Sequence, residues 1–300
     1  MQDPSFLTSG TRLWSDKSAS LANNKASKPC SSCAALVQMA ELQPTPTPTD
    51  ADDSDDSSAS RARKRRAVIR RGWSNTVASN SDATVHEQRF DLSGDGGTVI
   101  CEVDDSAGAV SDSAICLARY LERNRAAVDG KSILELGCGT GFLGLVAAAL
   151  GARSVDLTDL DNALPLAERN CQRFRDARGP AAEVRAAALP WGLSPTRDYD
   201  VVLVADCLLR DASHLYAPLC DTLADCLRSD NKGYFACEQR TSDLQPFFDR
   251  LHELEITALL ITDLHPSYSA SEIFVYELEL DTSGNKTRQQ RASTESSNSS

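Results

Sequence analysis

The feature that most constrains the fold of this chain is an apolar segment that runs directly into closely spaced glycines, ILELGCGTG at residues 133–141. A second apolar run, 142–150, follows at once. The pattern predicts a buried strand, a tight turn and a helix, because glycine adopts positive φ and lets a ligand approach the backbone. Such a helix points its free N–H groups at the turn, as in sites that hold a nucleotide-like ligand after the first strand of a parallel sheet.

Two acidic residues flank this turn and indicate what kind of ligand it holds. Glu135 lies two residues before Gly137, where a carboxylate would repel a pyrophosphate but suits an ammonium or sulfonium group. Asp159 ends the next short apolar segment, twenty residues beyond Gly139, and can accept hydrogen bonds from ribose hydroxyls. Asp161, the next acidic residue after Asp159, could instead be the N-cap of the helix that carries Leu164 and Leu166. A dinucleotide site, suggested by G-x-G-x-x-G at 139–144, is the weakest alternative because Glu135 is misplaced for it.

The segment ELGCGTG resembles motif I of the S-adenosylmethionine-dependent, seven-β-strand methyltransferases. The resemblance implies that the cofactor is S-adenosyl-L-methionine. It also implies that Glu135 lies near the methionine end of the cofactor, that Gly137, Gly139 and Gly141 pass beneath it, and that Asp159 binds the ribose.

Residues 82–280 alternate between strand-like and helix-like segments, which predicts an α/β domain with a parallel sheet. We expect a seven-stranded, mostly parallel sheet with helices on both faces, a Rossmann-like methyltransferase fold, preceded by an N-terminal β-hairpin. The hairpin comprises 85–90 and 98–103. The expected sheet strands are 132–136, 155–157, 183–187, 201–205, 233–237, 256–262 and 273–278. The expected helices are 114–121, 142–150, 215–227, 244–254 and one that carries Leu164, Leu166 and Ala167.

Four further stretches resemble the methyltransferase-16 family, which consists mainly of protein-lysine methyltransferases. They are GAVSDSA at 108–114, LPWG at 189–192, VVLVADCLL at 201–209 and FACEQR at 235–240. The resemblance implies that Asp206 orients the incoming lysine amine as the catalytic residue. It places Asp112 and Trp191 beside the cofactor, and Glu238 and Arg240 at the mouth of the substrate site.

Several of these side chains could instead have a purely structural role. Asp206 could cap the next turn, Trp191 could be a core residue, and Glu238 and Arg240 could form an ion pair. Three positions depart from the family pattern: Leu209 replaces an aromatic residue, Ser111 a tryptophan and Pro190 an aspartate. Since an aromatic ring could hold an ammonium by a cation–π contact and leucine cannot, two further functions stay open. These are a small-molecule methyltransferase and a non-catalytic, cofactor-binding interaction protein.

Composition divides the chain into three parts. Residues 1–81 are a polar, low-complexity tail with a basic cluster at 61–71, residues 82–280 are the methyltransferase domain, and residues 281–300 are a second tail. The domain holds 33 Asp and Glu against 17 Lys and Arg, a net charge of −16. It should repel nucleic acid and attract a basic protein substrate. Any contact with nucleic acid, or a nuclear-import signal, would therefore come from the basic cluster in the tail. We expect the protein to be a monomer.

Cysteine usage and hydropathy bear on the cell compartment. Cys101, Cys116, Cys138, Cys207 and Cys237 lie within apolar segments, which favours reduced thiols and therefore the cytoplasm or the nucleus. The pair Cys30 and Cys33 has the spacing of half a zinc site but no second pair follows, so we expect no metal. No apolar run approaches the roughly 20 residues that span a bilayer, and no secretory signal is recognised.

Overall fold

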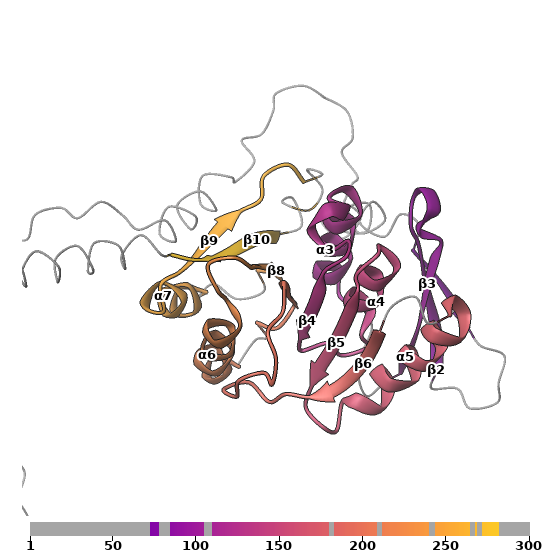
Figure 1. Cartoon of the computed structure of the whole chain (residues 1–300), viewed down its shortest axis with the longest axis horizontal. Coiled ribbons are helices and arrows are strands. Elements are labelled where there is room, and N and C mark those ends of the chain that lie inside the picture. The colour runs from indigo at the N-terminus through magenta and orange to yellow at the C-terminus, as the bar shows by residue number, and fades with distance from the viewer. Residues whose placement is uncertain are drawn as a thin grey trace, which may run out of the picture. The chain divides into compact units, whose positions relative to one another are not determined.

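The computed structural model describes residues 73–77, 85–104, 110–179, 183–208, 212–239, 244–264, 268 and 272–281. Within these ranges the chain forms a seven-stranded sheet covered by helices on both faces, and a three-stranded antiparallel sheet (Figure 1). The basic cluster at 61–71 and the tail from residue 282 lie outside the described residues.

The large sheet is parallel over five strands and is completed by an antiparallel hairpin. Along the chain its strands are β4 (Ser132–Leu136), β5 (Ser154–Asp159), β6 (Glu183–Ala188), β7 (Val201–Ala205), β8 (Lys232–Glu238), β9 (Ile256–Leu260) and β10 (Ile273–Leu280). Across the sheet the order is β6-β5-β4-β7-β8-β10-β9. β10 pairs antiparallel with both β8 and β9. The predicted seven-stranded, mostly parallel sheet is therefore confirmed.

Side chains of alternate residues in the central strands point to opposite faces of the sheet, and each face carries its own hydrophobic core. Ile133 packs on the face covered by α3 (Asp112–Arg123), α4 (Phe142–Ala149) and α5 (Leu164–Arg178). Leu134 and Leu136 pack on the face covered by α6 (Tyr216–Cys226) and α7 (Gln245–Glu253), as Figure 1 shows. All eight residues of α4 are buried, which explains why that segment is apolar on every side.

The small sheet contains the expected hairpin and one additional strand. β2 (Val85–Asp91) and β3 (Thr98–Asp104) pair antiparallel, and a short 3-10 turn at Gly94–Gly96 lies between them. β1 (Trp73–Val77) pairs with β2 through all five of its residues, so the folded part includes a strand that precedes the expected start at residue 82. Trp, Thr and Val favour strands, and cross-strand pairing outweighs the polar residues around them.

The described cysteines match the expectation of buried thiols. All eight of them are buried and free, including the five that the sequence singled out. Cys30 and Cys33 lie outside the described residues. Among the residues with described coordinates, no helix is long and apolar enough to cross a membrane, and no three His, Cys, Asp or Glu side chains gather as a metal site.

Candidate functional site

The predicted cofactor residues meet at the carboxyl edge of the parallel sheet. β4 lies between β5 and β7, and Leu136 is in register with Thr158 on one side and Val204 on the other. Gly137, Asp159 and Asp206 therefore follow three adjacent strands at the same edge. This is the point where the strand order reverses, which is where open α/β sheets bind their ligands.

The glycine turn has the backbone that its sequence predicts. Gly137, Gly139 and Gly141 have φ angles of 69°, 51° and 78°, all in the left-handed region. A Cβ at Gly137 would lie 2.7 Å from Cys207 Sγ, and one at Gly141 would lie 2.5 Å from a Leu157 methyl carbon. A Cβ at Gly139 would meet nothing within 4 Å. Packing thus requires glycine at the two outer positions, whereas the central one faces open space that a ligand can enter.

Glu135 is buried beneath the turn and acts on the helix that follows. Its Oε2 accepts a hydrogen bond of 2.8 Å from the backbone N–H of Gly144, in the first turn of α4. Since Gly141 supplies no side-chain cap, this carboxylate takes that role. Burial raises the pKa of Glu135 from 4.5 to about 8; the Gly144 bond lowers it and the nearby charge of Asp159 adds to the rise. Cofactor contact by Glu135 stays a prediction.

Asp159 joins the end of β5 to the glycine turn. Its Oδ2 accepts from the Gly139 N–H and its Oδ1 from the Leu160 N–H, each at 2.8 Å. Each oxygen keeps a lone pair that a ribose hydroxyl can use. Asp161 is not the N-cap of α5, because Ala163 occupies that position and makes no side-chain cap.

Asp206 follows β7 in a backbone conformation that is costly for a non-glycine residue. Its φ is 60°, and its N–H donates to the carbonyl of Ala236 in β8 at 2.9 Å. The Ser113 hydroxyl donates to Asp206 Oδ1 at 3.5 Å, so the start of α3 lies beside it. Asp112 is buried at the first position of α3, and Ser111 is its N-cap, accepting from the Ala114 N–H at 3.1 Å. The serine that replaces the family's tryptophan thus has a structural role.

Trp191 lies against the glycine turn on the side of β6. It belongs to a tight turn in which the Leu193 N–H donates to the Pro190 carbonyl at 3.2 Å, and Gly192 has a φ of 92°. The Gly192 N–H donates to Thr222 Oγ1 at 2.8 Å, which fixes the turn to α6. The indole is only partly buried and would lie 3.0 Å from a Cβ at Gly137. Trp191 also packs against the hydrophobic core on the α6 and α7 face, so its contact with a cofactor stays a prediction.

The structure places only part of the predicted substrate mouth. Glu238 is the last residue of β8, is partly exposed and pairs in register with Ile273. Arg240 and Leu209 lie outside the described residues, so neither the expected mouth nor the alternative ion pair is tested.

Sequence reasoning gave no place at this edge to three residues that shape it: Ser113, Asn170 and Cys207, which was predicted only as a buried thiol. Each is polar or polarisable and sits among apolar neighbours, which is the signal that could have found them. Asn170 is fully buried on the face of α5 that also carries Ala167, Cys171 and Phe174. Its side chain donates to the carbonyl of Thr140 in the glycine turn at 2.9 Å.

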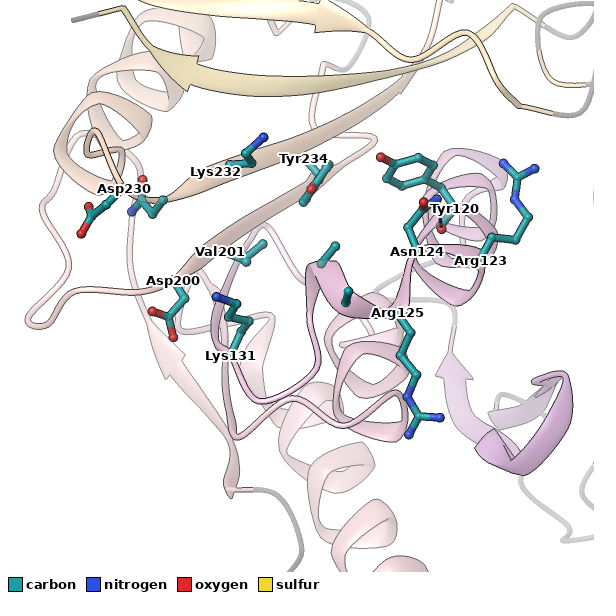
Figure 2. A pocket seen from close by; sticks show the side chains of 13 residues that line it. Tyr120, Arg123, Asn124, Arg125, Lys131, Asp200, Val201, Asp230, Lys232 and Tyr234 are labelled. Atoms are coloured by element: carbon teal, nitrogen blue, oxygen red, sulfur yellow. Dashed lines mark hydrogen bonds between the residues drawn. The ribbon is translucent and has the colours of Figure 1, made fainter.

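A separate hollow of about 750 Å³ lies at the opposite edge of the sheet, around the starts of β7 and β8 (Figure 2). Its lining includes Tyr120, Lys131, Val201, Lys232 and Tyr234. It shares no residue with the predicted cofactor site. The Lys232 ammonium is already paired with Glu277 and Glu279. This hollow supplies residues for control variants far from the carboxyl edge.

Comparisons with known proteins find relatives of this chain. The sequence profile of the lysine methyltransferase family matches residues 101–254. Protein N-lysine methyltransferase METTL21A of Danio rerio is 32% identical over 151 residues, 49% of this chain and 67% of the relative. EEF1A lysine methyltransferase 3 of Xenopus tropicalis is 32% identical over 171 residues, 56% of this chain and 68% of the relative. Among solved structures, the 16S rRNA N2 G1207 methyltransferase RsmC of T. Thermophilus, in complex with AdoMet and guanosine, has a TM-score of 0.49 and 16% identity, covering 69% of this chain and 58% of that chain.

Proposed function

We propose, from the fact that this chain belongs to the lysine methyltransferase family, that it transfers a methyl group from S-adenosyl-L-methionine to a lysine side chain of a basic protein. The observation that carries the proposal is the meeting of Glu135, three positive-φ glycines and Asp159 at one edge of the sheet. That arrangement offers the Asp159 carboxylate, the acid of Glu135, which a nearby positive charge would ionise, and an open backbone to a ligand with a ribose and a positive charge.

The residues present fit this cofactor. Asp159 has lone pairs that can accept from the ribose hydroxyls. The open space beside Gly139 leaves room for the cofactor, and the acid of Glu135 favours a positive charge nearby. Trp191, which lies against the glycine turn, would pack on the adenine, and Asp112 at the start of α3 would lie beside the cofactor. When bound, the cofactor supplies an electrophilic methyl group, so the protein has to supply alignment and a neutral nucleophile.

Asp206 is proposed to orient the acceptor amine. It follows the central strand β7 at the edge where the cofactor residues meet, and its strained φ is held by the bond to Ala236. A lysine must lose its proton before it attacks, and a partly desolvated site lowers its pKa. A carboxylate beside the amine favours its approach and gives the departing proton a neighbouring acceptor.

The partner class follows from charge. Residues 82–280 carry a net charge of −16, which attracts a basic protein and disfavours nucleic acid. The eight described cysteines are buried and free, which supports a reducing compartment, so we propose the cytoplasm, and we propose nuclear entry through the basic cluster at 61–71.

A label-transfer experiment tests the function. The full chain is incubated with a cell lysate and S-adenosylmethionine carrying a tritiated methyl group, and labelled proteins are digested to identify the methylated residue. We expect a labelled protein band that contains methyl-lysine. Asp206→Asn should reduce the label at least tenfold while keeping the fold, because asparagine also tolerates positive φ.

Asp230→Asn is the matched control, because Asp230 lines the hollow at the opposite edge of the sheet and should not affect labelling. Label found only in small molecules would favour the small-molecule methyltransferase instead. Cofactor binding without any transfer would favour the non-catalytic interaction protein.

A further inference from the structure

Asn170 uses both of its N–H donors and one of the two lone pairs of its Oδ1 inside the protein. Its Oδ1 accepts from the Glu102 N–H at 2.7 Å, and its Nδ2 donates to the Glu102 carbonyl at 3.0 Å and to the Thr140 carbonyl at 2.9 Å. The side chain is fully buried. A buried amide with this many partners has one orientation only, because any other would leave donors and acceptors unpaired.

The three bonds join two parts of the fold that are far apart in sequence. Glu102 lies in β3, at the edge of the small sheet that β2 does not cover, and Asn170 pairs with its backbone as a neighbouring strand would. Thr140 lies in the glycine turn, between Gly139 and Gly141. Asn170 is therefore a direct link from the N-terminal sheet, through α5, to the candidate cofactor site.

A second set of contacts holds β3 and its neighbour β2 to the same helix without reaching the glycine turn. The Arg173 guanidinium pairs with Glu87 and Glu102, and Arg169 pairs with Glu102 at 3.2 Å. These ion pairs are partly exposed. They separate the two roles of α5: Arg169 and Arg173 attach the sheet, whereas Asn170 alone among the three also bonds the turn.

The Thr140 peptide is a sensitive point at which to fix the turn. Glycine on both sides leaves its orientation weakly determined by local backbone preferences. That orientation sets the direction of the Gly141 N–H in the same peptide, which donates to the Cys138 carbonyl at 2.7 Å, while Asn170 holds the carbonyl end. The Asn170 bond ties this peptide to a rigid, buried helix residue outside the turn, and it can therefore favour the conformation that receives a ligand.

We propose that Asn170 is a positioning residue that presets the glycine turn for the cofactor and couples it to the N-terminal sheet. This inference rests on the proposed function, since it assumes that the turn binds S-adenosylmethionine. Asn170 touches neither the cofactor nor the acceptor; it acts through the Thr140 carbonyl. Disturbance of the N-terminal sheet at Glu102 would reach the cofactor site by the same route.

Two substitutions of Asn170 test the proposal in the full chain. Asn170→Asp keeps the size and the acceptor for the Glu102 N–H but places an oxygen against two carbonyls. Asn170→Ser removes both donated bonds and is milder for the fold. Binding of S-adenosylhomocysteine is measured by calorimetry and unfolding by thermal denaturation, with Arg173→Gln as the control that loosens β3 but leaves the Thr140 bond.

We expect both Asn170 variants, while folded, to bind S-adenosylhomocysteine at least tenfold more weakly than wild type, and Arg173→Gln to bind within twofold of wild type even if its unfolding temperature falls as much. In the label-transfer assay the Asn170 variants should need at least tenfold more cofactor for half-maximal labelling but reach a similar maximum. Binding by a folded Asn170 variant within twofold of wild type would overturn the inference, as would equal weakening by Arg173→Gln. Failure of the wild type to bind would instead refute the proposed function.

Discussion

At the scale of single residues, the carboxyl group of Glu135 has an environment that its sequence position does not disclose. The sequence predicts an acid near a positively charged ligand, and the structure places that acid fully inside the protein, capping α4 through Gly144. Asp159 was easier to predict, because the end of a short apolar strand fixes its place at the sheet edge. The Asn170 bonds could not be predicted, since they depend on how β3 meets α5.

The raised pKa of Glu135 predicts how stability depends on pH in the ligand-free protein. Its pKa is about 8 in the folded state against an ordinary value of 4.5. Between these values the native protein holds a proton that the unfolded chain has released, so the free energy of unfolding falls as pH rises through that window. Glu135→Gln cannot titrate and should flatten this part of the profile. Thermal unfolding of both proteins from pH 5 to 9 checks this, and parallel profiles would contradict it.

The same group predicts a proton linkage that distinguishes cofactor from product. The sulfonium of S-adenosylmethionine should favour the ionised Glu135, so its binding near pH 7 should release a larger fraction of a proton than binding of S-adenosylhomocysteine, with a difference of up to about one proton per site. Calorimetry in two buffers of different ionisation enthalpy measures this number. The difference should vanish in Glu135→Gln, and equal release by both ligands in wild type would show that Glu135 does not face the sulfonium.

At the scale of elements, the strands and helices follow closely from hydrophobic pattern, whereas their ends and partners do not. β4 was predicted with the bounds that the structure has, because five buried residues end at a glycine. β1 was missed because its short apolar signal is surrounded by polar sequence and becomes a strand only by pairing with β2. The sequence did not locate the first residue of α5, Leu164, because its N-cap residue has no side chain that caps the helix.

The glycine turn predicts a contrast between two alanine substitutions. Gly141→Ala would press a methyl group into buried Leu157 and hold positive φ, which should cost about 3 kcal/mol of stability. Gly139→Ala faces open space and should cost only the strain of positive φ, about 1 kcal/mol.

Despite its small effect on stability, Gly139→Ala should weaken S-adenosylhomocysteine binding at least tenfold, because its methyl group enters the space assigned to the ligand. Urea denaturation and calorimetry on the two variants separate these effects. Unchanged binding by Gly139→Ala would place the ligand elsewhere.

At the scale of the whole molecule, sheet topology and net charge have different roles. The parallel sheet brings acids from three strands to one edge, while the net charge of −16 over residues 82–280 is proposed to attract a protein partner at longer range. Family membership and fold were predictable because they depend on local motifs and on strand–helix alternation. The acceptor side of the site stays a prediction, because Leu209 and Arg240 lie outside the described residues.

The charge argument predicts a salt effect on methyl transfer but not on cofactor binding. Raising the salt concentration from about 0.1 M to about 1 M shortens the screening length from about 10 Å to about 3 Å. Labelling of a basic protein should therefore fall several-fold, whereas the affinity for S-adenosylhomocysteine should change less. Titration of salt in both assays makes the comparison, and labelling that is insensitive to salt would argue against attraction to a basic partner.

The central claim is that the carboxyl edge around Glu135, the glycine turn and Asp159 receives an adenosyl cofactor. Calorimetric titration of the full chain with S-adenosylhomocysteine tests it most directly, with Asp159→Asn as the variant and Asp230→Asn as the control. We predict one binding site in wild type and in the control, and affinity at least tenfold weaker in Asp159→Asn. No heat and no thermal shift at millimolar ligand, or equal binding by Asp159→Asn, would contradict the account.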